Sequence, residues 1–451
     1  MHTLSKTTLG KPTQQSASST RPADPAVAND VRNEFLHAWE GYKEYAFGHD
    51  RLKPLSKSFD EFFLEGESLG LTIIESLDTM YLMGLDGELE IAVEWIENHL
   101  TFDYDQEIQV FEATIRLVGG LIAGYLATDN ETLVNLATDL ADRLLPAFEK
   151  SATGMPYRFV NLHTGEVSGS ENFLAEIGTH IAEWGVLSEL VNDDRYYNAA
   201  KKALEAVYER RSDLDLVGAT INVETGEWVD PVARIGPPVD SLYEYLWDGW
   251  VLFGDTDLLR WYSVLLDGIL THQAERYNGN LWFKRVDMNS GELVNREQSE
   301  LAQFFAGLLC ESGQPALGGE YHDSWTEVHE LYGLPPGHVD YSDLSAISTT
   351  YYLRPEYLGP ALLLYDETGD EVYRERAYRH YKQMKEHCRV STGYTVIDDV
   401  TTRPMQQGDL TMGYWFSENM KYLYLLFSEP ERLDRQNYYL TTEGNVLRGL
   451  K

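Results

Sequence analysis

Apolar residues recur at helical spacing in one block after another along almost the whole chain. A period of 3.6 residues gathers apolar side chains on one face of a helix, so each block predicts a helix. In the first part of the chain the predicted helices cover 31–45, 70–83, 88–99, 109–127, 131–151, 173–191, 196–211, 241–253 and 257–274. Later ones cover 299–312, 320–333, 355–368, 371–388 and 417–427. The pattern predicts an almost entirely helical protein.

Longer polar segments separate alternate helices, and several contain strand-like pairs around a turn, at 160–168, 218–228 and 277–292. Such pairs predict small β-hairpins in the loops. Many helices are apolar on more than one face, as in LTIIESLDTMYLMGL, which indicates burial between two layers. We therefore expect a closed, two-layered ring of helical hairpins whose loops at one end build a site.

The ends of the chain set the expected domain boundaries. Residues 1–29 are rich in Ser, Thr, Pro and Ala and lack the apolar core of a signal peptide, so we expect a disordered or artificially added segment. Residues 30–451 are expected to form one catalytic domain. These features do not determine the cellular compartment. They fit a soluble bacterial protein that is periplasmic or secreted.

The balance of charge excludes several classes of partner. The chain carries 36 Lys and Arg against 73 Asp and Glu, a formal net charge of −37. Such a chain repels nucleic acid and anionic lipid, and we expect neither as a partner.

No window of 18 apolar residues was found, so we also expect no membrane span. Cys310 and Cys388 allow at most one disulfide. We expect the protein to be a monomer.

Acidic residues embedded in apolar segments indicate where a functional site lies, because a buried carboxylate is costly unless it is paired or protonated. Glu112 lies in IQVFEATIRLVGG, one turn before Arg116, so the two share a helix face as a cleft pair or as a structural ion pair. Asp240 in PPVDSLYEYLW and Glu356 in YYLRPEYLGP are candidate site residues. Each also has a structural reading, as a helix cap or as a first-turn acid.

Two further segments carry acids of the same kind. Glu176 and Glu183 in LAEIGTHIAEWG are seven residues apart and face the same way on a helix. Glu418 lies in GYWFSENMKYLYLLF among aromatic residues, which form either a platform for a sugar ring or ordinary core.

Together these segments resemble the class I α-mannosidases, glycoside hydrolase family 47, from Arg32 to about Leu447. The motifs LGLTIIESLDTMYLMGL, FEATIR, AEIGTHIAEW, DSLYEYL, YYLRPE, FSENMKYLYLLFSE and LTTEGNVL occur in the family's order. The resemblance implies an all-α (α/α)7 barrel of helical hairpins, with a C-terminal hairpin plugging one end. It also implies a Ca²⁺ cofactor, with Thr442 as the metal ligand, and oxygen ligands of this kind suit calcium.

The resemblance further implies roles for individual residues. Glu112, Asp240 and Glu356 correspond to the catalytic carboxylates of an inverting hydrolase, which needs an acid and a base. We assign Glu112 as general acid and Glu356 as general base, with Asp240 as the competing acid. Expected contacts to the substrate, with Tyr414 as an alternative to Phe416 for ring stacking, are Arg116, Glu176, Arg354, Phe416, Glu418 and Glu443.

The expected function is exo-acting, calcium-dependent hydrolysis of terminal α-1,2-linked mannose from an oligosaccharide. One alternative is a mannose-binding, lectin-like protein of the same fold, and another is a helical-barrel epimerase. The chain also departs from the family pattern. Glu300 replaces a histidine, Gly359 replaces an acidic residue, and Pro238 or Val239 replaces an arginine. These departures concern contacts to the outer part of the substrate.

Overall fold

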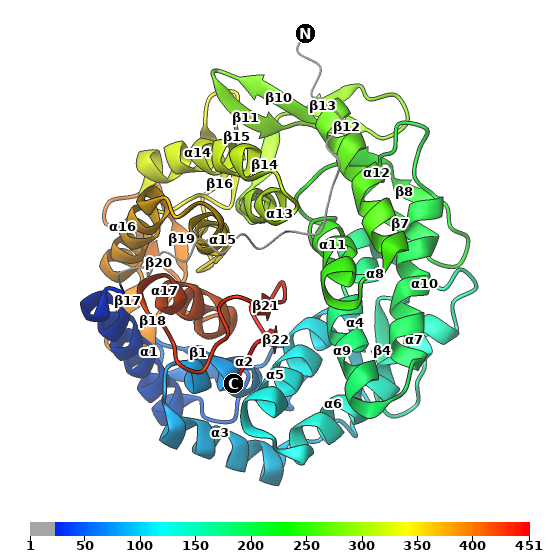
Figure 1. The fold of residues 1–451 in the computed structure, drawn as a ribbon. Coiled ribbons are helices and arrows are strands. Elements are labelled where there is room, and N and C mark those ends of the chain that lie inside the picture. The colour runs from blue at the N-terminus through cyan, green and yellow to red at the C-terminus, as the bar shows by residue number, and fades with distance from the viewer. Residues whose placement is uncertain (1–22) are drawn as a thin grey trace.

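Helical segments that are buried nearly all round form the inner wall of a ring in the computed structural model, which describes residues 23–451 (Figure 1). In α2 every residue except Tyr81 is buried, as expected for a helix packed between two layers. The inner segments, in chain order, are α2 (Leu71–Leu82), α4–η1–α5 (Val110–Glu112, Ala113–Val118, Gly119–Thr128), α8–α9 (Leu174–Gly178, Ile181–Val191), α11 (Ser241–Phe253), η2–α13 (Glu300–Phe304, Phe305–Glu311), α15 (Leu358–Thr368) and η3–α17 (Trp415–Asn419, Met420–Phe427).

Amphipathic helices form the outer layer and alternate with the inner segments along the chain. In α3 only Leu89, Ala92 and Ile96 are buried, at the spacing of one helical stripe. This alternation of inner and outer helices confirms the predicted (α/α)7 barrel. The outer helices are α1 (Pro25–Tyr45), α3 (Asp86–His99), α6 (Glu131–Leu144) with the short α7 (Pro146–Glu149), α10 (Arg195–Glu209), α12 (Thr256–His272), α14 (Pro315–Tyr332) and α16 (Glu371–His387).

Connections at the two ends of the ring differ in length. Each inner helix passes to the next outer helix through two or three residues, and Gly254 and Gly369 end α11 and α15 in the left-handed conformation that glycine favours. Connections back to the inner wall are long and carry strands, as predicted. The site-bearing loops therefore lie where the inner helices begin. The strands form the antiparallel sheets β1–β2 (Arg51–Lys53, Ser58–Asp60), β3–β4–β5 (Glu107–Gln109, Phe159–Asn161, Val167–Ser168), β6–β7–β8 (Glu171–Phe173, Thr220–Asn222, Trp228–Asp230), β9–β12–β13 (Val232–Ala233, Arg285–Asp287, Leu293–Asn295), β10–β11 (Ala274–Tyr277, Asn280–Phe283), β14–β15–β16 (Glu297–Ser299, His338–Asp340, Ser345–Ser348), β17–β18 (Arg389–Val390, Gly393–Tyr394) and β19–β20 (Ile397–Asp399, Gln406–Gln407).

Two helices begin more than a full turn earlier than their apolar pattern predicts. Helix α1 starts at Pro25 rather than at residue 31, because Asp24 accepts capping bonds from the amides of Ala26 and Val27. Helix α14 likewise starts at Pro315 rather than at residue 320, with proline in the first turn. Of the expected N-terminal segment, residues 1–22 lie outside the described part of the chain.

A C-terminal hairpin of β21 (Tyr439–Leu440) and β22 (Val446–Arg448) lies inside the ring (Figure 1). A buried ion pair holds it there. Asp78 Oδ2 accepts from Lys421 Nζ at 2.7 Å and from the Val446 amide at 2.8 Å, while Lys421 also donates to the Gly444 carbonyl. The turn between the two strands is thereby fixed against the inner wall.

The inner segment 110–128 is apolar and long enough to cross a membrane by composition, with a mean hydropathy of 1.4. In the structure, however, 72% of that window is buried within the barrel. Cys310 and Cys388 are both free and buried.

Candidate active site

One cavity of about 630 Å³ occupies the lumen of the barrel beside the C-terminal hairpin. Its size is that of a ligand pocket. The expected catalytic residues Glu112, Asp240 and Glu356 all line it, although they come from three different inner segments. Each lies at the beginning of its segment, which brings the three to the loop-rich end. The sequence-predicted residues Arg116, Glu176, Arg354, Glu418, Thr442 and Glu443 line the same cavity.

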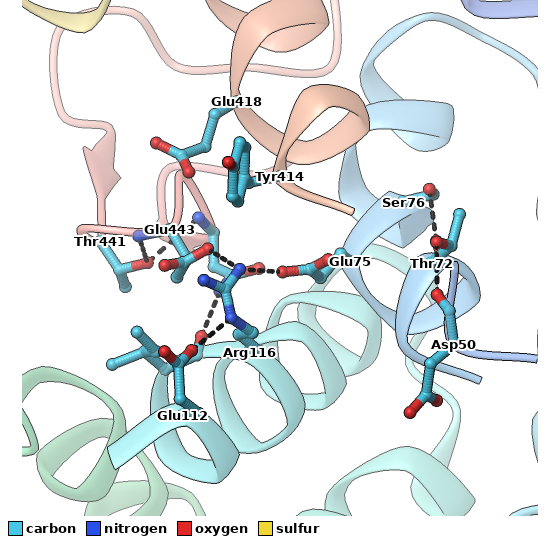
Figure 2. A network of polar contacts seen from close by, with 12 residues as sticks. Asp50, Thr72, Glu75, Ser76, Glu112, Arg116, Tyr414, Glu418, Thr441 and Glu443 are labelled. Carbon is cyan, nitrogen blue, oxygen red and sulfur yellow. Dashed lines mark hydrogen bonds and ion pairs between the residues drawn. The ribbon is translucent and has the colours of Figure 1, made fainter. Parts of the chain in front are cut away.

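Arg116 is the centre of a buried ion-pair network (Figure 2). Its Nε donates to Glu112 Oε2 at 2.5 Å, and its Nη1 donates to Glu75 at 2.8 Å and to Glu443 at 2.6 Å. Burial raises the pKa of Glu75, and it raises that of Glu443 well above its ordinary value, in both cases against the nearby Arg116 charge. One guanidinium thus faces three carboxyl groups, and burial favours the protonated forms of Glu75 and Glu443.

Two π-helical turns bring site residues onto the cavity wall. Arg116 lies in η1, and Glu418 lies in η3. A π-turn inserts an extra residue into a helix, and such turns occur frequently at functional sites. Glu418 Oε2 accepts from the Tyr422 hydroxyl at 3.0 Å, and burial raises the pKa of Glu418 well above its ordinary value.

Glu356 and Asp240 both have raised pKa values. Burial raises the pKa of Glu356 to about 7 against the opposing effect of Arg354, and its Oε2 has no hydrogen-bond partner among the described residues. Burial raises the pKa of Asp240 to about 6. Asp240 stands at the N-cap position of α11, as the helix-cap interpretation has it, but its side chain makes no capping bond.

Both oxygens of Glu176 accept hydrogen bonds from neighbouring side chains. Arg158 donates to both of its oxygens, at 2.9 and 3.1 Å, and Gln109 donates to Oε1 at 2.8 Å. The Arg354 guanidinium lies 5.0 Å from the ring centroid of Tyr414, which joins it to the aromatic wall of the cavity.

The prediction that Phe416 stacks on a sugar ring is wrong. Phe416 is 1% exposed and does not line the cavity, because its ring packs into an aromatic core with Phe35 at 5.3 Å and Trp415 at 5.0 Å. Tyr414 lines the cavity instead. It lies four residues before Glu418, one helical turn away, so that the spacing already favoured Tyr414.

Thr442 lies at the turn of the C-terminal hairpin, where its hydroxyl donates to Glu244 Oε2 at 3.1 Å. Glu244 and Glu75 were both missed in the sequence. Glu244 follows Asp240 by four residues and therefore shares its helix face, and Glu75 is an acid inside a wholly apolar helix. Within residues 23–451, no group of three or more His, Cys, Asp or Glu side chains is arranged to hold a metal.

Glu300, which stands where the family pattern has histidine, is 2% exposed and lies next to the site. Its Oε2 has no hydrogen-bond partner among the described residues. Burial raises its pKa well above the ordinary value, opposed by the charge of Arg354. A carboxylic acid in this environment holds its proton.

A two-layered helical barrel whose loop end gathers several carboxylates in one pocket is an architecture of glycoside hydrolases. The chain belongs to glycosyl hydrolase family 47, whose family model matches residues 34–449. An α-mannosidase I of Arabidopsis thaliana is 36% identical over 92% of this chain and 76% of its own length. A mannosyl-oligosaccharide 1,2-α-mannosidase IA of Sus scrofa is 30% identical over 94% of this chain and 69% of its own length.

The fold is also that of a solved relative. An α-1,2-mannosidase from Trichoderma reesei superposes with a TM-score of 0.87 at 24% identity, covering 95% of this chain and all 100% of the other. The resemblance recognised in the sequence is thereby confirmed. The names of these relatives give no support to the lectin-like alternative, and membership in a hydrolase family argues against an epimerase.

Proposed function

We propose that this protein is an exo-acting, inverting α-1,2-mannosidase that removes terminal mannose from an oligosaccharide. The observation that carries the proposal is the convergence of Glu112, Asp240 and Glu356 on one cavity. The names of the Arabidopsis and pig relatives support the choice of mannose, and that of the pig relative, a 1,2-α-mannosidase, supports the linkage.

Glu356 is the proposed general base. An inverting hydrolase needs a carboxylate that takes a proton from the attacking water. A base is most effective when its pKa lies near the working pH, and burial raises the pKa of Glu356 to about 7. Its Oε2, without a protein partner among the described residues, is available to accept the proton from water.

Glu112 is the proposed general acid, and Asp240 competes with it. The 2.5 Å bond from Arg116 Nε holds the carboxyl group of Glu112 in place at the cavity, from where Glu112 would protonate the glycosidic oxygen through a water molecule. Burial raises the pKa of Asp240 to about 6, which lets Asp240 hold a proton in weakly acidic solution. A specific observation therefore favours each residue.

A calcium ion is proposed to bind at Thr442. The carboxyl groups of Glu244, Glu418 and Glu443 line the same cavity as Thr442, and a bound cation would favour their ionised forms. Thr442 would hold the ion through oxygen, and water molecules would complete the sphere. When bound, calcium supplies Lewis-acid stabilisation and orients the sugar hydroxyls.

The remaining cavity residues are proposed to bind the terminal mannose. Arg354 and Tyr414 form a cationic and aromatic wall, and Glu176 offers carboxylate oxygens to sugar hydroxyls. Burial of the sugar among fixed charges strengthens every such contact, because water no longer screens them.

Hydrolysis of α-1,2-mannobiose, with and without a chelator, tests the proposal. We expect release of mannose that stops on chelation and returns with Ca²⁺, and proton NMR should detect β-mannose first, as inversion requires. Unchanged mannobiose would overturn the activity, α-mannose as the first product would overturn inversion, and full activity in chelator would overturn the calcium requirement.

Amide variants test the assigned roles. Glu112→Gln and Glu356→Gln should keep sugar binding and lose turnover by roughly 10²- to 10⁴-fold, the usual contribution of a general acid or base. Glu94→Gln, on the exposed face of outer helix α3, is the matched control. Near-full activity in either site variant would remove that residue from its role.

A further inference from the structure

The cavity does not end at the catalytic carboxylates but continues along the inner wall. On α11 its lining residues step by three or four positions, from Asp240 through Glu244 and Trp247 to Val251. Those positions form one helix face. At 1.5 Å per residue this face extends about 16 Å, which is nearly the whole length of α11.

Two neighbouring inner segments line the cavity in the same way. On η2–α13 the lining runs from Leu301 to Glu311, and around α15 it runs from Glu356 to Glu367. Gly359 lines the second of these faces near its catalytic end, where the family pattern has an acidic side chain. A continuous passage therefore extends beside the C-terminal hairpin, from the beginnings of α11, α13 and α15 to their ends.

Solvent reaches the far end of this passage. Glu311 and Glu367 lie at or next to the ends of inner helices α13 and α15, and both line the cavity and are exposed. Gln436 and Arg448, from the segment before the hairpin and from β22, are exposed and line the same end. The cavity thus has a second opening opposite the loop-rich end.

The walls of the passage suit a neutral polyhydroxyl compound. Its middle part combines the aromatic rings of Trp247 and Tyr439 with the carboxyl group of Asp248, which is 7% exposed. Carboxylate oxygens accept bonds from hydroxyl groups, and aromatic faces cover the apolar face of a sugar ring.

We propose that this passage is the exit route of the monosaccharide released at each turnover. The inference rests on the proposed function. In an exo-acting hydrolase the cleaved sugar lies at the inner end of the pocket, behind the trimmed glycan that fills the loop-rich mouth. A second opening lets the monosaccharide leave without waiting for the glycan.

Tryptophan substitutions at the far part of the passage test the route. Val251 and Leu363 line it, are partly exposed, and lie outside the proposed catalytic and sugar-binding set. Val251→Trp and Leu363→Trp should lower steady-state turnover of α-1,2-mannobiose at least threefold. The rate of a single turnover, with enzyme in excess and quenched-flow detection, should stay within twofold of the parent. A burst of one mannose per enzyme should then precede the slow phase.

Two controls separate blockage from general damage. Leu363→Met keeps the volume of the side chain and should turn over like the parent. Leu331→Trp places the same bulk on the outer helix α14, where Leu331 is 58% exposed, and should also be silent. If one blocking variant does not fold, as judged by circular dichroism, the other carries the test.

The outcomes are distinct. Equal steady-state rates in parent and blocked variants, or an equal fall in the single-turnover rate, would overturn the exit route while leaving the proposed function in place. A parent enzyme without even a first turnover would overturn the proposed function, and the exit route with it.

Discussion

Arg116 and Glu443 form a 2.6 Å ion pair although 327 residues separate them in the sequence. Arg116 belongs to the inner wall and Glu443 to the C-terminal hairpin, so the pair joins the two parts of the protein that make the site. Both side chains are 9% exposed, which makes the pair little sensitive to salt.

Replacement of Arg116 by lysine should damage the site although the charge is kept. Lysine cannot present a planar fork to Glu75, Glu112 and Glu443 together. We expect Arg116→Lys to lower kcat/KM roughly 10- to 100-fold, the usual effect of losing a group that orients a site. Steady-state hydrolysis of mannobiose measures this, with Arg195→Lys at an exposed ion pair as control. A variant within twofold of the parent would show that charge alone suffices.

The dependence of the hydrolysis rate on the leaving group identifies the general acid. An aryl mannoside with a good leaving group needs no protonation, so the variant that lacks the acid should recover activity on it while staying inactive on mannobiose. If Asp240 is the acid, Asp240→Asn should show this recovery, and if Glu112 is the acid, Glu112→Gln should. Recovery in neither variant would contradict both assignments.

Lys421→Met should strongly destabilise the fold. Lys421 is fully buried against Asp78, and removing one partner of a buried pair costs about 3–5 kcal/mol, because the other charge is left uncompensated. Urea unfolding measures the change. Asp78→Asn added to Lys421→Met should restore part of the loss, since the amide is neutral and its oxygen still accepts from the Val446 amide. A double variant less stable than the single one would contradict this account.

Glu183 should make stability depend on pH. It is fully buried beside Tyr245, and burial raises its pKa to about 8 in the folded protein, above the ordinary value of 4.5. The folded state then holds a proton that the unfolded state releases, so this contribution is complete below about pH 4.5 and is lost as the pH rises through 8. We expect Glu183→Gln to remove this dependence, a difference on the order of a few kcal/mol between pH 5 and pH 9.

Thermal or urea unfolding of parent and variant across this range checks the prediction. Glu94→Gln on the exposed face of α3 serves as the matched control. Parallel pH curves for parent and Glu183→Gln would show that Glu183 is not protonated in the fold.

Much of the architecture could be predicted from local pattern. The bounds of α11 were predicted to the residue, since an uninterrupted apolar pattern ends at Gly254. The starts of α1 and α14 were missed, because each helix opens on a proline and its first turn depends on a cap or on that proline rather than on a repeated apolar spacing. Periodicity detects the buried face of a helix and not its exposed first turn.

Less of the site could be predicted from local sequence patterns. Glu112, Asp240 and Glu356 could be singled out as acids in apolar surroundings, but their meeting in one cavity depends on closure of the ring, which no local pattern encodes. Phe416 was misplaced although it lies only two residues before Glu418, a spacing that puts the two side chains on different faces of a helix. Glu75 was passed over, although an acid in a helix as apolar as α2 is the same kind of signal.

The hairpin that carries Thr442 and Glu443 has a consequence for the making of the protein. During synthesis on the ribosome the segments with Glu112, Asp240 and Glu356 emerge first. Glu443, which pairs with Arg116 from the hairpin, lies 327 residues after Arg116 and emerges later. A nascent chain therefore holds all three proposed catalytic carboxylates before it can assemble a working pocket. Activity should appear abruptly, once the last hairpin has entered the ring.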